Sequence, residues 1–206
     1  MRCGGFGRGI AVTVIIRHGL PNALRGDAAR LYWQAFGGKL GRVLGPERLA
    51  FGLLDRVMRG DHAIVAVSDS GALLGLVGFK SPEGAFVGGA LTDMIGVYGT
   101  FGALWRAGLL WLLERDLDND RFLMDGICVA ATARGQGVGT ALLEAICAEG
   151  RARGYPSVRL DVIDINPRAR ALYERQGFVA LRTSQIGLLR WVFGFSAATT
   201  MVRNLV

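Results

Sequence analysis

A run of glycines at alternate positions, placed directly before a helical pattern, constrains this chain more than any other feature. The run is Arg134-Gly135-Gln136-Gly137-Val138-Gly139-Thr140, and it follows the apolar segment 127–129. Glycine lets the backbone turn tightly and approach a ligand closely. The first N–H groups of a helix have no partner inside it, and the helix dipole adds about half a positive charge there. The sequence therefore predicts a pyrophosphate-binding loop, to which Arg134 brings a full positive charge.

The length and charge of the chain limit what surrounds this loop. At 206 residues we expect a single domain over residues 1–206, with residues 1–9 frayed and residues 85–116 as an atypical apolar segment. The net charge of +7 favours anionic partners, such as a phosphorylated cofactor, nucleic acid or an acidic membrane surface. Because the basic residues are scattered and lack the stripe of a nucleic-acid reader, we expect no nucleic-acid partner.

Cysteines and histidines give no sign of a metal centre. Cys3, Cys128 and Cys147 are widely spaced and form no CxxC pair, so neither a disulfide framework nor a zinc site is predicted. His18 and His62 have no partner at ligand spacing, and we expect no metal. The N-terminus also lacks the continuous apolar region of a signal peptide. Together these features predict a cytoplasmic setting.

Hydrophobic periodicity and the order of the elements predict a mixed α/β chain with one sheet. The turn residues 68–71 join two apolar runs as a hairpin, and Gly37-Gly38 are expected to end the first helix. Asn166-Pro167 opens the last long helix, with Asn as N-cap. The expected strands are 10–17, 62–67, 73–79, 122–129, 158–163, 178–180 and 199–202, and the expected helices are 23–36, 47–58, 138–154 and the one beginning at Pro167.

The apolar stretch 85–113 is the least typical part of the chain. Residues 94–113 approach the roughly 20 residues that a membrane span needs. Four glycines weaken a free helix, however, and Arg106 lies within the stretch. Because a strand-rich core flanks the stretch on both sides, we interpret it as a buried or pocket-lining helix pair and expect no membrane span. A surface for a membrane or for oligomers is the alternative.

Dinucleotide-binding proteins also place glycines between a strand and a helix, so the loop alone is not decisive. Asp161 or Asp164 even lies about twenty residues on, where a ribose-binding acid is expected. The loop comes late, however, and too few residues follow it for the rest of a doubly wound half and a substrate domain. The ATP-binding GxxxxGK[ST] pattern is absent from the sequence.

Two motifs together resemble the GNAT superfamily of acyl-CoA-dependent N-acyltransferases. Its motif Arg/Gln-x-x-Gly-x-Gly/Ala is matched by residues 134–139, after a strand that ends in Ile127-Cys128-Val129. Its next motif, a strand, an Asn, a short helix carrying Tyr and then Gly-Phe, is matched by residues 166–178. The resemblance covers about residues 122–180. It implies a single central, twisted, mixed and largely antiparallel sheet flanked by helices. It also implies an N-acetyltransferase that moves an acetyl or longer acyl group from acetyl-CoA to a primary amine in a ternary complex.

The resemblance also implies how the co-substrate acetyl-CoA is held. Backbone N–H groups of residues 136–140 would bind its pyrophosphate, and residues 127–129 would pair with the pantetheine arm like an added strand. A main-chain N–H on that strand would stabilise the oxyanion. The implied cofactor-binding residues are Ile127, Cys128, Val129, Arg134, Gly135, Gln136, Gly137, Val138, Gly139, Thr140 and Asn166.

Two catalytic residues are candidates. By the resemblance, Tyr173 would protonate the departing thiolate, although an aromatic on this apolar helix face can also simply fill the core. Asp125 lies two residues before Ile127 and is a candidate general base; the alternative is an ordinary strand-end Asp. Asp93 and Glu114 are weaker candidates.

The acceptor is expected to be a small-molecule or peptide amine. The early helices and segment 85–113 would form a pocket with hydrophobic walls, which suits an aromatic or alkyl amine. The sequence leaves open whether the protein forms a homodimer. Two other classes of function also stay open: a non-catalytic acyl-CoA-binding sensor, and a membrane or oligomer interaction protein built on 85–113.

Overall fold

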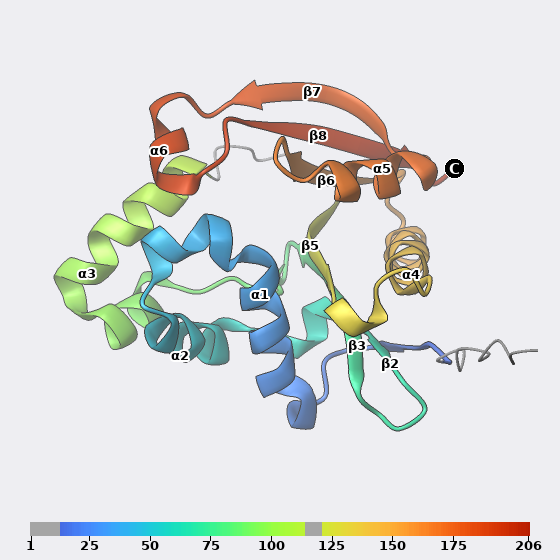
Figure 1. The fold of residues 1–206 in the computed structure, drawn as a ribbon, viewed down its shortest axis with the longest axis horizontal. Coiled ribbons are helices and arrows are strands. Elements are labelled where there is room, and N and C mark those ends of the chain that lie inside the picture. The colour runs from blue at the N-terminus through green and yellow to red at the C-terminus, as the bar shows by residue number, and fades with distance from the viewer. Residues whose placement is uncertain (1–12, 114–120) are drawn as a thin grey trace, which may run out of the picture.

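The computed structural model describes residues 13–113 and 121–206 (Figure 1). The expected fraying of residues 1–9 and the candidate Glu114 fall outside this part of the chain. The strands are β1 Ile15–His18, β2 Ala63–Val67, β3 Leu73–Ser81, β4 Gly84–Ala85, β5 Phe122–Val129, β6 Ser157–Ile163, β7 Val179–Gln185 and β8 Ala197–Asn204. The α-helices are α1 Arg25–Leu44, α2 Glu47–Val57, α3 Leu91–Leu113, α4 Val138–Ala152, α5 Pro167–Arg175 and α6 Arg190–Phe193.

The described strands form one sheet in the order β1-β2-β3-β5-β6-β8-β7, with β4 beside β3. Strands β5 and β6 pair in parallel, and the other named pairs in this sheet are antiparallel. This arrangement confirms the predicted mixed and largely antiparallel sheet flanked by helices. A parallel pair needs a crossover, and α4 supplies it between β5 and β6.

Helices cover both faces of the sheet, with α4 on one side of β5 and α1 and α2 on the other (Figure 1). Helix α4 buries Leu142, Leu143 and Ile146 against the strands, which is the face that its sequence spacing predicts. On the opposite face, Tyr32 of α1 and Leu54 of α2 pack on the central strands. Each such fully buried side chain contributes about 1.5–3 kcal/mol. The sheet therefore has a core on each side.

Helix α1 continues past Gly37-Gly38, so the prediction that these glycines end it is wrong. A Cβ on Gly37 would lie 3.0 Å from the Trp33 ring, so glycine lets that indole lie along the helix. The added turns bury Val43 and Leu44 in a third apolar cluster with α2, α3 and α6. This tertiary burial outweighs the low helix propensity of glycine, about 1 kcal/mol per residue. As a consequence, Lys39 belongs to a helix rather than to a connection.

Segment 85–113 supplies α3, which is broken in the middle. Gly99 has φ 69° and ψ 168°, so two helical halves meet there, as the predicted helix pair requires. Arg106 lies against α1: its guanidinium donates to the carbonyls of Val43 at 2.7 Å and Gly45 at 3.2 Å. The Tyr98 hydroxyl donates to Leu44 O at 2.6 Å. These bonds satisfy carbonyls at the C-terminal end of α1 and explain a cation inside an apolar stretch.

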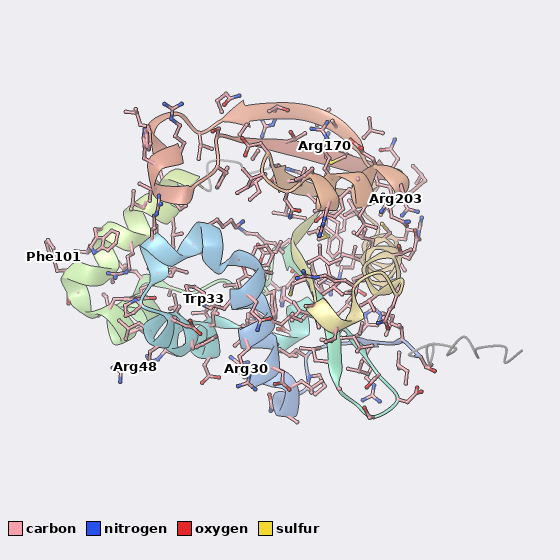
Figure 2. The ribbon with its side chains drawn as sticks, in the orientation of Figure 1. Arg30, Trp33, Arg48, Phe101, Arg170 and Arg203 are labelled. Atoms are coloured by element: carbon pink, nitrogen blue, oxygen red, sulfur yellow. The ribbon has the colours of Figure 1, made fainter. Side chains whose placement is uncertain are left out.

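One face of the second half of α3 is exposed, so the expectation of a buried helix pair holds only in part. Phe101 is 85% exposed and points away from the body of the protein (Figure 2). The spacing of the exposed residues places them on one helical stripe. Within residues 13–113 and 121–206, no helix is both long and apolar enough to cross a membrane. The stripe consists of Phe101, Leu104, Trp105, Gly108 and Trp111.

Candidate functional site

Strands β5 and β6 separate soon after they begin. Their described pairing is limited to Phe122 with Val158 and Leu123 with Arg159. Beyond Leu123, β5 stays paired with β3 through Val129 on its other edge. The backbone of β5 on the β6 side is thus open, and a cavity of about 390 Å³ lies there. An open strand edge is suited to pair with an extended ligand.

A β-bulge shapes β5 at the point where the strands separate. Met124 lies opposite Phe79 and Gly126 lies opposite Gly78, so Asp125 is the extra residue. A bulge redirects side chains and often lies next to an active site. Asp125 therefore departs from the regular alternation of the strand, and its side chain belongs to the cavity wall.

Four helices and strands contribute most of the cavity wall. Helix α1 supplies its second half, β5 and β6 supply their diverging ends, and α5 supplies one face, so segments distant in sequence meet at one opening. The lining residues used below are Phe36, Lys39, Asp125, Gly126, Ile127, Val129, Gly139, Asp161, Asn166, Leu172 and Tyr173.

The glycine loop is an open helix N-terminus. Gly135 and Gly137 have φ 76° and 81°, values that favour glycine, and Gly137 caps α4 without any side chain. Gln136 donates back to Thr132 O at 2.8 Å and Arg134 donates to Val129 O at 3.3 Å, so both side chains are held beside the loop. The first N–H groups of α4 are left to an external acceptor.

Asn166 and Tyr173 enter the cavity from α5. Asn166 is the predicted N-cap, with Oδ1 accepting from Ala169 N at 3.2 Å, and it also lines the cavity. Tyr173 packs in the core, with its ring centroid 6.0 Å from that of Phe178, and lines the same cavity. Burial raises the pKa of Tyr173 to about 12. The phenol therefore keeps its proton at neutral pH.

Three charged residues meet in the cavity. Asp161 on β6 is held by Thr200, whose hydroxyl donates to Oδ1 at 2.5 Å, and by Arg159, which donates to Oδ2 at 3.2 Å. Lys39 enters from α1. Burial lowers the pKa of Lys39 below its ordinary value of 10.5, and the nearby carboxylates of Asp125 and Asp161 oppose that shift. An amine whose pKa is lowered by burial thus shares the cavity with two carboxylates.

The predicted site residues divide into three groups. Asp125, Ile127, Val129, Gly139, Asn166 and Tyr173 line the cavity. Arg134, Gly135, Gln136, Gly137, Val138 and Thr140 form the adjoining loop and first turn of α4. Cys128 is buried in the apolar cluster between the sheet and helices α1 and α2 and does not line the cavity, and this burial raises the pKa of its thiol to about 12.

Segment 85–113 contributes no lining residue to this cavity. The expectation that this segment forms a hydrophobic wall of the acceptor pocket is therefore wrong for the described cavity. The weaker base candidate Asp93 instead accepts from Ala90 N at 2.8 Å at the start of α3. The wall comes instead from residues on either side of Gly37 in α1, namely Ala35, Phe36, Gly38 and Lys39, and Lys39 belongs to it because the helix runs through Gly37-Gly38. Among the described residues there is no group of three or more His, Cys, Asp or Glu that could hold a metal ion.

The sequence prediction missed Phe36, Lys39 and Asp161 as cavity residues. Asp161 gave a signal, because it alternates with the apolar residues of β6, but only the divergence of the strands brings it beside Asp125. Phe36 lies so close to β5 that a Cβ on Gly126 would be 2.8 Å from its Cζ. This close approach holds α1 on the bulge.

Comparisons with known proteins agree with this geometry. The model of the acetyltransferase (GNAT) family matches residues 27–178. A solved acetyltransferase aligns at 20% identity with a TM-score of 0.62, over 93% of this chain and 100% of its own. An N-acetyltransferase from Staphylococcus aureus Mu50 aligns at 15% identity with a TM-score of 0.63, over 91% and 99%. Ard1 from Thermoplasma volcanium aligns at 19% identity with a TM-score of 0.59, over 96% and 99%. At these identities the structures share the fold, while the family match spans well over half of the chain.

Proposed function

Because the chain belongs to the GNAT family of acetyltransferases, whose members use acetyl-CoA, we propose that it transfers an acetyl group from acetyl-CoA to a primary amine. Transfer occurs by direct attack in a ternary complex. The observation that carries this proposal is the convergence of an open strand edge, an open helix N-terminus, a buried phenol and a bulged carboxylate at one cavity.

The residues of the chain fit acetyl-CoA as a co-substrate. The first N–H groups of α4 and the charge of Arg134 suit its pyrophosphate. The open edge of β5 from Ile127 to Val129 suits the amide groups of the pantetheine arm, with the main chain of Cys128 included. Asn166 lies at the N-terminal end of α5, where its side-chain amide can donate to the pantetheine arm.

The chemistry requires three proton transfers and one acyl transfer. Asp125 takes a proton from the ammonium group, directly or through water, and the neutral nitrogen attacks the thioester carbonyl carbon. A main-chain N–H of β5 stabilises the oxyanion. The carbon–sulfur bond then breaks, and Tyr173, which is protonated at neutral pH, donates its proton to the thiolate. The nitrogen loses its second proton as the amide forms, and that proton restores the Tyr173 phenol, directly or through water. The products are an amide and the free thiol of coenzyme A.

The acceptor end of the cavity combines a charged and an apolar part. Asp125 and Asp161 favour a cationic amine, and Phe36 and Leu172 supply apolar wall for an aromatic or alkyl substituent. We therefore propose a primary amine with a hydrophobic body as the substrate class. The wall comes from α1 and α5 rather than from segment 85–113.

The test is an acetyl-transfer assay on purified protein. Acetyl-CoA is mixed with a panel of primary aromatic and alkyl amines, free thiol is followed with a chromogenic disulfide, and each product is identified by mass spectrometry. Each N,N-dimethyl analogue is the matched control, because a tertiary amine yields no stable amide. We expect amine-dependent thiol release with the primary amines alone. Binding of acetyl-CoA with no transfer to any amine would instead support the acyl-CoA sensor.

A further inference from the structure

Lys39 is an unusual cation for this chain. Of the 24 basic side chains, Lys39 and Lys80 are the two lysines, and all the others are arginines. Arginine stays protonated in proteins, whereas a lysine amine can lose its proton and act as a nucleophile. Lys80 lies exposed on β3, but Lys39 lines the cavity. One of two nucleophilic amines among the side chains is therefore inside the candidate active site.

The position of the Lys39 amine is set by α1. Its Nζ lies 5.1 Å from the centre of the Phe36 ring. The same ring lies against Gly126, where a Cβ would be 2.8 Å from Phe36 Cζ. The amine thus lies near the bulge of β5, next to the strand edge to which the proposed function assigns the thioester. Asp125 and Asp161, which contribute electrostatically to its protonation, line the same cavity.

We propose that Lys39 is a self-acetylation site: when no other amine occupies the cavity, its Nζ takes the acetyl group from bound acetyl-CoA. This inference rests on the proposed function. The neutral Nζ attacks the thioester carbon, a new carbon–nitrogen bond forms and the carbon–sulfur bond breaks. Asp125 accepts the proton that leaves Nζ, and Tyr173 protonates the departing thiolate. The products are an amide on Lys39 and the free thiol of coenzyme A, so no oxidant or further reactant is needed.

Self-acetylation would also limit the enzyme. The modified Lys39 is neutral, larger and no longer nucleophilic, so its amide occupies the acceptor end of the cavity. Asp125 and Asp161 lose a nearby cation, which changes the electrostatics of the proposed base. We infer that amine turnover falls as Lys39 becomes acetylated, and that a high concentration of acceptor protects the enzyme by competing for the same acetyl group.

The test uses the full chain and isotope-labelled acetyl-CoA with no added amine. Labelling distinguishes acetyl groups gained in the assay from any gained earlier. Peptide mass spectrometry then compares Lys39 with Lys80 and the N-terminal amine, which report ordinary chemical acetylation. We expect Lys39 to be labelled on the order of tenfold faster or more, because the bound donor is held beside it. Its first-order rate constant should not depend on protein concentration, and excess coenzyme A should suppress its labelling but not that of Lys80.

Matched variants sharpen the comparison. Lys80→Arg should keep the label on Lys39 and the full amine turnover, whereas Lys39→Arg should remove the label while its unfolding temperature shows that it is folded. Equal labelling of Lys39 and Lys80 would overturn the proposal. So would an unlabelled Lys39 in a protein that binds acetyl-CoA and acetylates added amines, and that result would leave the proposed function intact. No binding of acetyl-CoA and no transfer to any amine would overturn both.

Discussion

Asp125 and Asp161 line the same opening from two strands, each two residues beyond the last parallel pair, Leu123 with Arg159. The two carboxylates are held differently. Asp161 accepts from the Thr200 hydroxyl and from Arg159, whereas Asp125 sits on the bulge and its Oδ2 accepts from Val87 N at a longer distance of 3.5 Å. We therefore expect Asp161 to help hold the geometry of the cavity opening and Asp125 to exchange protons with the amine.

Replacing the proposed base should separate these roles. We expect Asp125→Asn to lower kcat/KM for the amine by about 10²-fold or more, since an amide cannot accept the proton. The acidic limb of the pH–rate profile should flatten as well. Asp161→Asn is the matched control, and we expect its main effects on stability and on the KM of the amine. Wild-type turnover by Asp125→Asn across the pH range would remove Asp125 from the mechanism.

Removing the phenol of Tyr173 should affect the chemical step rather than donor binding. With its pKa raised to about 12, Tyr173 carries a proton for the thiolate throughout the neutral range. We expect Tyr173→Phe to lower kcat by about 10²-fold while the KM for acetyl-CoA stays unchanged. Tyr155→Phe deletes the same hydroxyl from a ring that packs on Phe122 outside the cavity and should keep full turnover. Equal rates in all three proteins would leave Tyr173 as a core residue.

The glycine loop offers a pair of matched backbone variants. Gly137 at the start of α4 and Gly154 after its end have φ 81° and 80°, and a Cβ on either would have no heavy atom within 4 Å. Alanine at each should cost about 1–2 kcal/mol of stability from the left-handed conformation. Isothermal titration should show that only Gly137→Ala weakens acetyl-CoA binding, because only that backbone faces the donor. Equal affinities in the two variants would contradict a pyrophosphate site at this loop.

The pKa of Lys39 predicts how stability depends on pH. Burial lowers the folded-state pKa below 10.5, so between the two values the unfolded chain binds more protons than the native protein. The stability of the wild type relative to Lys39→Met should therefore rise from the folded-state pKa toward about pH 10. The other titratable side chains that line the cavity with the Lys39 amine are Asp125, Asp161 and Tyr173.

Urea unfolding of Lys39→Met and of its control Lys80→Met, at several pH values, measures this trend. Lys80 lies exposed on β3, and its substitution should not reproduce the trend of Lys39. If the free energy of unfolding of the wild type, relative to that of Lys39→Met, falls as the pH rises, the result would contradict the burial of the Lys39 amine.

Arg106 should be structural despite its position in an apolar helix. It donates to three carbonyls, those of Val43, Gly45 and Gly102, so Arg106→Met should remove the Arg106 donor from the Val43 and Gly45 carbonyls at the end of α1. We expect a loss of about 2 kcal/mol or more in the free energy of unfolding. Arg48→Met on the exposed side of α2 removes an equal charge and should change stability by at most about 0.5 kcal/mol (Figure 2). Equal stability of the two variants would contradict the capping role of Arg106.

Local features of the chain could be predicted from its sequence because they depend on residues close together. The glycine loop, the apolar face of α4 and the Asn166 cap are of this kind, and the structure confirms each of these local elements. The mixed sheet followed from the order of strand and helix patterns. The roles in acetyl transfer assigned to the site residues stay predictions, which the variants above test.

The remaining features depend on tertiary contacts that no local pattern contains. Gly37-Gly38 indicate a helix end, yet burial of Val43 and Leu44 keeps α1 helical and carries Lys39 to the cavity. The meeting of Asp125 with Asp161 needs both the bulge and the divergence of two strands. The exposed stripe on α3 departs from the favoured interpretation of segment 85–113 as a buried helix pair. Apolar composition alone does not identify which helix face the rest of the protein covers.

Thermal unfolding with and without acetyl-CoA is the direct test of a donor site between β5 and β6, and NAD and ATP are the control ligands. A ligand at one hundred times its dissociation constant adds about 2.7 kcal/mol to the free energy of unfolding, which raises the Tm of a protein of this size by several degrees. We expect such a rise with acetyl-CoA and none with NAD or ATP, and a smaller rise for Gly137→Ala. An unchanged Tm at millimolar acetyl-CoA, in a folded protein, would contradict a donor site between β5 and β6.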